Sequence, residues 1–431
     1  MKTSLRLLTL LAFEGFLLVS CEGPQGLPGE DANESCKTCH NPTVVDAKAV
    51  QYELSKHSYG EAAFEEAGSN TCGPCHLSES FKDVVGRNVS AAFIADPANP
   101  GKFMNPYAST TDKAYGEINC FTCHDNLHTS YTETDFLPLT TTAAVPMTMW
   151  SGAKTINLTQ DGGISNLCVK CHQPRPFTNS NTDKNILNYA GLVSNPTAVF
   201  YDAAQSNSLN VLKPSYRTHT HYGTVGAVFA GMGGVEFTGT LSYSSSKHTT
   251  DASCQDCHMA PMTGKAGGHT FVAKGNFNGC TSCHPAVTNA SQAAEYWSTP
   301  RTEIKTLLDQ LAAKLQINGV DILNRDGDSE SNLWYAITTN HYDGYLNIYD
   351  PVTNPSMQTY NASSFQYIGT PGSTWSQAQK DYNATLPKIT LTKAQMGALI
   401  NFQMCLREYS LGIHNYKYVK ALLTNTLAIL P

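Results

Sequence analysis

The sequence predicts a mainly α-helical protein that also contains much irregular structure. A five-residue pattern, Cys-X-X-Cys-His, occurs six times between residues 36 and 284. Only 15% of the residues are charged, whereas the chain has 32 glycines and 21 prolines. This composition favours loops that wrap around bound groups over a bundle of helices. Beyond residue 285 the pattern is absent, and three stretches with helical spacing of apolar residues follow.

The six copies of the motif occupy residues 36–40, 72–76, 120–124, 168–172, 254–258 and 280–284. Two thiols three positions apart on one helical turn can each form a thioether bond with a vinyl group of a haem, and the next histidine then lies under the iron. The pattern is the attachment signature of a c-type haem. We therefore expect six covalent haem c groups, bound by Cys36, Cys39, Cys72, Cys75, Cys120, Cys123, Cys168, Cys171, Cys254, Cys257, Cys280 and Cys283. The expected proximal iron ligands are His40, His76, His124, His172, His258 and His284.

Other uses of paired cysteines explain the motifs less well. Zinc sites, iron–sulfur clusters and disulfides do not require a histidine after every second cysteine, and here it follows all six. Residues 72–75 read CGPC, which is typical of thioredoxin-like redox sites, but the flanking residues lack the strand pattern of such a site.

Enough histidines remain to supply a second ligand to every iron. Six irons with two histidines each need six further imidazoles, and the sequence offers eight: His57, His128, His219, His221, His248, His269, His341 and His414. Met259 and Met262 are less favoured ligands, which would raise a reduction potential.

Two parts of the chain resemble a known family. Residues 216–284 contain YRTHTHYGTVGAVFAGMGGVEF, SKHTTDASCQDCHMAPMTGKAGGHTF and CTSCHP, and residues 400–423 read INFQMCLREYSLGIHNYKYVKALL. These segments resemble the multihaem cytochromes c of bacterial respiration, which include pentahaem nitrite reductases and octahaem hydroxylamine oxidoreductases. The resemblance implies a multihaem cytochrome c fold in which C-terminal helices pack on the haem array.

The same resemblance implies a set of distal ligands. It assigns His269 and His414 to this role, and His57 and His248 match common distal positions. His128 is a less specific match, and His219 and His221 compete for the remaining place. The nitrite reductases attach their catalytic haem through CXXCK, whereas every motif here ends in histidine, so their substrate pocket cannot be carried over.

The N-terminus predicts export. Residues 1–20 begin with Lys2 and Arg6 and continue into an apolar stretch, as a secretory signal peptide does, although Glu14 interrupts it. LLVSC at 17–21 resembles a bacterial lipoprotein signal, which implies an acylated Cys21; ordinary cleavage with an unmodified Cys21 is the alternative. Residues 21–35 would form the lipid anchor and an extended tether. We expect an exported protein anchored to the outer membrane, on its periplasmic or cell-surface face.

The remaining chain divides into two predicted regions. Residues 36–284 form the six-haem region. Its segment 222–246 is expected to contain short strands or only turns, and the many glycines there favour a close approach of the backbone to a cofactor or to a neighbouring segment. Residues 285–431 form a helical region that supplies a distal ligand. Helices are predicted over 300–317, 393–410 and 416–429, and 321–390 reads as mainly irregular. Cys405 is expected to be buried, His341 to lie at the surface, and the oxygen-bearing side chains of 324–330 to form a solvated turn in preference to a calcium loop.

Composition and motifs together predict the function. The net charge is −7 without any basic run, which argues against nucleic acid as a partner. Histidine can supply both protein ligands of all six irons, which leaves no coordination position for a substrate. We therefore expect electron transfer in extracytoplasmic respiration and no enzyme activity. The electron partners would be other cytochromes or an extracellular acceptor. The alternatives are a reductase of a small oxyanion or nitrogen or sulfur compound, with one open haem, and a subunit of a cytochrome filament formed by homopolymerisation.

Overall fold

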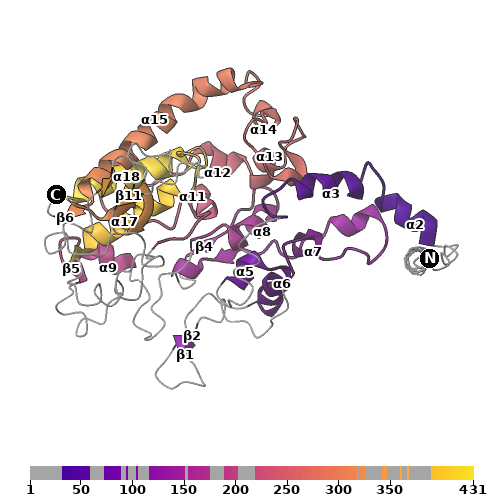
Figure 1. Cartoon of the computed structure of the whole chain (residues 1–431), viewed down its shortest axis with the longest axis horizontal. Helices are drawn as coiled ribbons and strands as arrows, with labels where there is room; N and C mark the ends of the chain where they lie inside the picture. Colours follow the sequence, from indigo (N-terminus) through magenta and orange to yellow (C-terminus); the bar gives the residue numbers. More distant parts are fainter. Residues whose placement is uncertain are drawn as a thin grey trace, which may run out of the picture.

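The fold is seen in a computed structural model of the 431-residue chain. The structure describes residues 32–58, 72–88, 94–95, 103–104, 116–150, 154–174, 189–201, 219–317, 320–325, 342–346, 360–361, 366–367 and 390–431. Three long helices, α15 (Ala290–Lys314), α17 (Lys393–Leu406) and α18 (Tyr416–Ile429), lie together at one end. The opposite end holds α2 (Ala32–Cys39) and α3 (Val45–Glu53), and the short helices of the other motifs lie between (Figure 1).

Each motif lies on or at the end of a short helix, as the chemistry of two thiols on one turn requires. After α2, these helices are α5 (Gly73–His76), α7 (Cys120–Cys123), α8 (Ile164–Cys171), α13 (Cys254–His258) and α14 (Asn278–Thr281). Side chains cap two of them directly: Asn119 accepts a hydrogen bond from the N–H of Phe121, and Ser253 accepts one from that of Asp256.

The other described helices are short, and strands occur only as two-residue to five-residue pieces in the described part. The helices are α6 (Ser78–Arg87), α9 (Tyr189–Ser194), α11 (Val225–Phe229), α12 (Lys247–Asp251) and the 3₁₀ turns η1 (Glu133–Phe136), η2 (Thr148–Trp150) and η5 (Gly268–Thr270). The strands pair antiparallel in twos: β1 (Ile94–Ala95) with β2 (Phe103–Met104), β3 (Val145–Pro146) with β4 (Thr155–Ile156), β5 (Val199–Tyr201) with β12 (Leu391–Thr392), β6 (Gln316–Ile317) with β7 (Val320–Asp321), β8 (Leu323–Arg325) with β9 (Tyr342–Leu346), and β10 (Tyr360–Asn361) with β11 (Gln366–Tyr367). The predicted mainly helical fold with much irregular structure is confirmed.

The apolar core lies where α15, α17 and α18 meet. Leu308 of α15, Phe402 of α17 and Leu422 of α18 are fully buried in it. Almost all of α17 is buried, so this helix is the centre of the C-terminal region and not a surface element. Cys405 lies on α17 and is fully buried, as predicted, and burial raises the pKa of its thiol well above the usual value.

A glycine-rich loop packs against this core. Asn401 of α17 holds it through both backbone groups of Val235, at 2.7 Å to the N–H and 2.8 Å to the carbonyl oxygen. A Cβ atom on Gly234 would lie 2.6 Å from Leu422, which explains why glycine stands there. Within 222–246 the structure has the short helix α11 and turns, without strands, and the predicted close approach to a neighbour is confirmed.

The three helices predicted for the C-terminal region agree with the structure to different extents. The helix over 416–429 is confirmed as α18. The helix over 393–410 is confirmed with its capping box of Thr392 and Gln395, but it ends at Leu406. The start of the helix over 300–317 is wrong, because α15 begins at Ala290, after an Asn289 cap, and contains Pro300. The missing proline N–H leaves the carbonyl of Tyr296 without its helical donor, and water can replace it because Tyr296 is exposed.

Several predictions concern residues outside the described part. These are the signal peptide, the anchor at Cys21, His341 and most of the acidic turn after Asn324. Residues 32–35, predicted as the end of an extended tether, form the first half of α2. In the described residues, no helix combines the length and the apolar character needed to cross a membrane.

Candidate haem centres

Each motif histidine lies beside one histidine from outside the motifs. The ring centres of the six pairs are 5.9–6.4 Å apart. We call the pairs centres 1 to 6, in the order of their motifs: His40–His128 (5.9 Å), His76–His221 (6.1 Å), His124–His269 (6.4 Å), His172–His57 (6.0 Å), His258–His414 (6.3 Å) and His284–His248 (6.3 Å). Among the described residues, the candidate ligands predicted from the sequence are thus brought together in twos, with His219 left over.

The spacing within the pairs fits an iron between two imidazoles. An imidazole nitrogen lies about 2 Å from a metal that it binds and about 1.1 Å from the centre of its own ring. Two imidazoles on opposite sides of one iron therefore have ring centres about 6 Å apart, as all six pairs do. Within the described residues, no group of three or more His, Cys, Asp or Glu could hold a bare metal ion. A haem needs only two protein ligands, because the porphyrin supplies four nitrogens.

Hydrogen bonds at Nδ1 fix the tautomer of several of these rings. The Nδ1 atoms of His124, His248 and His258 lie 2.8–2.9 Å from backbone carbonyl oxygens, of Phe136, Ile413 and Phe271 respectively. A carbonyl oxygen can only accept, so each Nδ1 carries the proton and leaves Nε2 available to a metal. The same bond fixes the orientation of the ring.

Burial keeps the central rings neutral. Desolvation lowers the pKa of His172 to about 4, with smaller contributions from His57, His258 and other neighbouring histidines. Burial likewise lowers the pKa of His269 to about 4, helped by Lys48. A metal ligand must be the neutral imidazole, so these environments suit the rings to bind iron.

His219 and His221 differ in what their surroundings allow. Nδ1 of His219 accepts a hydrogen bond from the Arg407 guanidinium at 2.6 Å and another from the N–H of His221 at 2.9 Å. Both partners are obligate donors, so Nδ1 of His219 is unprotonated and the neutral ring carries its proton on Nε2. Its Nε2 therefore has no lone pair for a metal. His221 instead faces His76, which favours it for centre 2.

Comparison with known proteins gives one match. Residues 88–293 match the family model described as Cytochrome c552. The match supports a multihaem c-type cytochrome. No curated protein and no solved structure matches the chain. Such cytochromes carry covalently bound haem c with iron, which agrees with the motif thiols and the paired imidazoles.

The motif thiols show which motifs are neighbours. The side chains of Cys75 and Cys171 hydrogen-bond, as do those of Cys168 and Cys254. The motif of centre 4 therefore adjoins those of centres 2 and 5. Burial raises the pKa of Cys257 to about 11, and Cys280 close by adds to the effect, so centres 5 and 6 also adjoin. In the described residues all motif cysteines are free thiols, as haem attachment requires.

Phe271 lies where three of the centres meet. Its ring is 4.9 Å from that of His57 of centre 4 and 6.0 Å from that of His269 of centre 3. Its carbonyl oxygen is the hydrogen-bond partner of His258 of centre 5. Phe271 has φ of 55°, a left-handed conformation that a bulky residue rarely adopts. Sequence reasoning missed this residue.

Glu408 is a second functional residue that sequence reasoning missed. It is 1% exposed, and its carboxylate lies 2.7 Å from Nδ1 of His414. Burial works to raise the pKa of Glu408, but hydrogen bonds from His414, Ser410 and the N–H of Gly412 outweigh it and leave the pKa below its usual value. The carboxylate is therefore ionised at neutral pH. A glutamate four residues before the GIHN segment carries no recognisable motif of its own.

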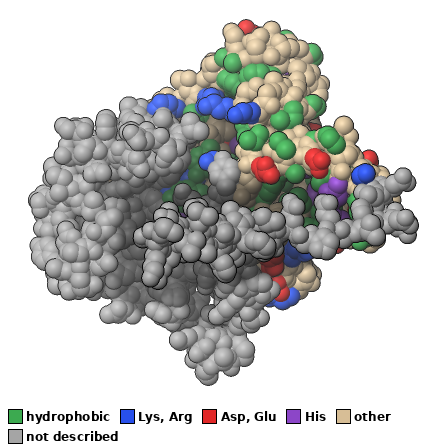
Figure 2. Space-filling model, turned by 45° about the vertical axis from the view of Figure 1, so that its right-hand side comes forward, with side chains coloured by type: hydrophobic (Ala, Val, Ile, Leu, Met, Phe, Trp, Pro, Cys, Tyr) green, Lys and Arg blue, Asp and Glu red, His purple; other side chains and the backbone are tan. Residues whose placement is uncertain are grey.

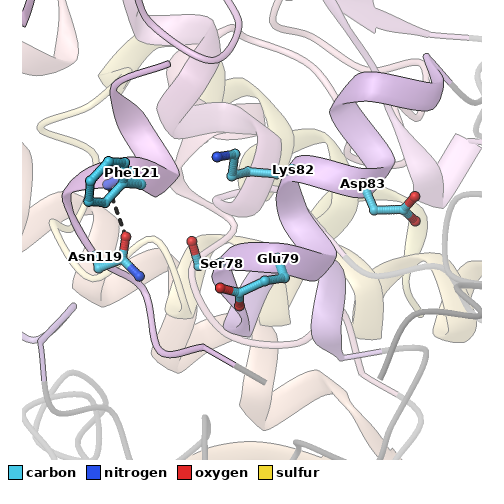
Figure 3. A pocket seen from close by; sticks show the side chains of 6 residues that line it. All are labelled: Ser78, Glu79, Lys82, Asp83, Asn119 and Phe121. Atoms are coloured by element: carbon cyan, nitrogen blue, oxygen red, sulfur yellow. Dashed lines mark hydrogen bonds between the residues drawn. The ribbon is translucent and has the colours of Figure 1, made fainter. Parts of the chain in front are cut away.

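A hollow in the described surface lies beside the third motif. Ser78, Glu79, Lys82 and Asp83 of α6 and Asn119 and Phe121 around α7 line a space of about 460 Å³, shown in Figure 3. Its charges have both signs, and no histidine lines it. Figure 2 shows histidine side chains at the surface, with acidic and basic side chains on the same face and without a large patch of one sign.

Proposed function

We propose that this cytochrome transfers electrons through six haem c groups, each closed by two histidines. The observation that carries the proposal is the pairing of every motif histidine with a second histidine at 5.9–6.4 Å. Iron that keeps the same ligands in both oxidation states needs little rearrangement for each electron, which suits a carrier. Small-ligand chemistry needs an open coordination position, and the six pairs leave none.

The ring pairs support a complete assignment of axial ligands. The proximal ligands are the six motif histidines, and the distal ligands of centres 1 to 6 are His128, His221, His269, His57, His414 and His248. When bound, haem supplies the one-electron chemistry. The chain holds each iron, fixes the ligand tautomer through Nδ1 and sets the polarity around each centre.

The contacts between motifs support one order of the centres. The Phe121 ring of the third motif lies 5.9 Å from that of His128, which joins centre 1 to centre 3. Phe271 joins centres 3, 4 and 5, and the cysteine contacts join centre 4 to 2 and centre 5 to 6. The proposed path is 1–3–4–5–6, with centre 2 as a side branch at centre 4. His40 and His128 at one end and His248 at the other are exposed, so electrons would enter and leave there.

A reductase is the second candidate. The match to the Cytochrome c552 family favours it, because that family includes nitrite reductases. It requires an iron that lacks its second histidine. The spectrum of the oxidised protein separates the two functions.

We expect an electron paramagnetic resonance (EPR) spectrum that is wholly low-spin, and haem analysis that gives six haems per chain. Ring orientation sharpens this test. Two imidazole rings with parallel planes donate electron density to the same iron d orbital, whereas rings with perpendicular planes donate to two different orbitals. The angle between the two ring planes therefore sets the spread of the g values in the EPR spectrum. Centre 5 has the smallest angle between its rings, 11°, and should give the most rhombic signal, whereas centres 2 and 6, with 77° and 87°, should give highly anisotropic signals. A high-spin signal equal to one iron per chain would overturn the carrier and support the reductase.

We propose further that the protein acts outside the cytoplasm, tethered through acylated Cys21 to the outer membrane. Export to the periplasm is typical of Cytochrome c552 proteins, which supports the location. The electron partners would be other cytochromes or an extracellular acceptor. Labelling of producing cells with a fatty acid, with Cys21→Ser as control, tests the anchor: label that persists in Cys21→Ser contradicts it. Filament formation, the remaining alternative, would appear in negative-stain micrographs of the native protein.

A further inference from the structure

Glu408 is a buried carboxylate directed at one ring of centre 5. It lies between the end of α17 and the loop that carries His414. It receives hydrogen bonds from Nδ1 of His414 at 2.7 Å and from the N–H of Gly412 at 2.8 Å, and one from the hydroxyl of Ser410. These donors hold the carboxylate in place, so its bond to the imidazole has a fixed geometry in a site without water competition.

Three other ligand rings have an Nδ1 partner that is a neutral acceptor. His124 of centre 3 and His248 of centre 6 face backbone carbonyl oxygens, at 2.9 Å and 2.8 Å. Within centre 5 itself, His258 also faces a carbonyl oxygen, at 2.9 Å. The carboxylate at His414 therefore distinguishes centre 5 from centres 3 and 6.

We propose that Glu408 is a positioning residue that lowers the reduction potential of centre 5, an inference that rests on the proposed electron-transfer function. A carboxylate draws the Nδ1 proton toward itself and makes the imidazole a stronger electron donor. A stronger donor stabilises the ferric iron more than the ferrous iron. The buried negative charge acts in the same direction, because it too favours the more positive iron.

The place of centre 5 in the proposed path gives this tuning a consequence. Centre 5 lies between centre 4 and centre 6, so every electron that travels the full path crosses it. With Glu408 at His414, the haem at centre 5 would be harder to reduce than without the carboxylate and would give up its electron more readily. Centre 5 would thus carry electrons only transiently, while centres on either side hold them.

The test replaces Glu408 by the isosteric Gln, which keeps an oxygen acceptor but removes the charge. In a potentiometric titration of the complete protein followed by EPR, Glu408→Gln should shift the rhombic signal of centre 5 to higher potential and leave the other signals in place. Glu303→Gln is the matched control, because Glu303 bonds Tyr416 and Lys420 near the same loop and touches no ligand ring. It should shift none of the signals. A folded Glu408→Gln protein with unchanged potentials, or an equal shift of all centres, would overturn the proposal.

A measurement on the unaltered protein covers the case in which Glu408→Gln does not mature. During reductive titration, the rhombic signal of centre 5 should outlast the signals of centres 3 and 6. Its disappearance before both would overturn the tuning by Glu408. A high-spin iron in the starting spectrum would instead overturn the proposed function, so the two failures are distinguishable.

Discussion

The ring of Phe271 lies 4.9 Å from that of His57, edge-on at 70°, and so braces the second ligand of centre 4 from a segment more than 200 residues away. The backbone of the same residue holds His258 of centre 5 through its carbonyl oxygen. One residue thus connects two adjacent centres by two different means, which substitution can separate.

Phe271→Leu should remove the aromatic brace and keep the carbonyl contact. An edge-to-face aromatic pair contributes about 0.5–1.5 kcal/mol, so we expect a loss of unfolding free energy of about 1 kcal/mol. The EPR signal of centre 4 should change and the rhombic signal of centre 5 should stay. Phe277→Leu is the control, because Phe277 packs on Trp297 and on no ligand ring. Equal spectral changes in both variants would contradict the role of Phe271.

His221 and His219 should respond in opposite ways to substitution. His221→Ala removes the proposed distal ligand of centre 2, so a high-spin signal equal to one iron should appear in the oxidised protein. His219→Asn keeps an acceptor for Arg407 and should leave every iron low-spin. A high-spin iron in His219→Asn but not in His221→Ala would reverse the assignment.

Asn401 should be a major contributor to the stability of the C-terminal core. Its side chain bonds both backbone groups of Val235 and the hydroxyl of Thr426, all of them buried. Each buried group left without a partner costs about 1–3 kcal/mol, so Asn401→Leu should lower the unfolding free energy by about 3 kcal/mol in denaturant titration. Gln160→Ala removes an exposed amide that also bonds backbone carbonyls and should change stability little. Similar losses in the two variants would show that burial is not the cause.

Glu303 should make folding sensitive to acid. Hydrogen bonds and charge from Lys420, together with the hydroxyl of Tyr416, lower the pKa of Glu303 below its usual value. Its contribution to stability is therefore present above the pKa of the unfolded chain and is lost as the pH falls through the lower pKa of the folded chain. Below this range, the stability of Glu303→Gln should equal that of the unaltered protein, whereas at pH 7 it should be lower. A difference between them that does not change with pH would contradict this linkage.

The sequence predicted the local structural features but not the contacts between residues far apart in the chain. The motif turns, α18 and the cap at Thr392 follow from residues close together in the chain, and they are confirmed. The predicted helix start at Pro300 is wrong, because the Asn289 cap and the burial of Ala293 place the start of α15 earlier in the chain. The eight spare histidines gave the number of candidate ligands. Their pairing depends on contacts between segments far apart in the chain, and no local pattern encodes it. The hydrogen bond between Lys417 and Ser246, which are 171 residues apart, is one contact of this kind.

The position of centre 2 has a consequence for storage. As a side branch at centre 4, it is off the proposed path between the exposed ends. An electron held at centre 2 would not block other electrons that move along the path, and it could stay there until an acceptor binds. The side chains of Cys75 and Cys171 lie together and so place centre 2 next to centre 4. The protein would then be able to store an electron at centre 2 and deliver more than one in a single encounter.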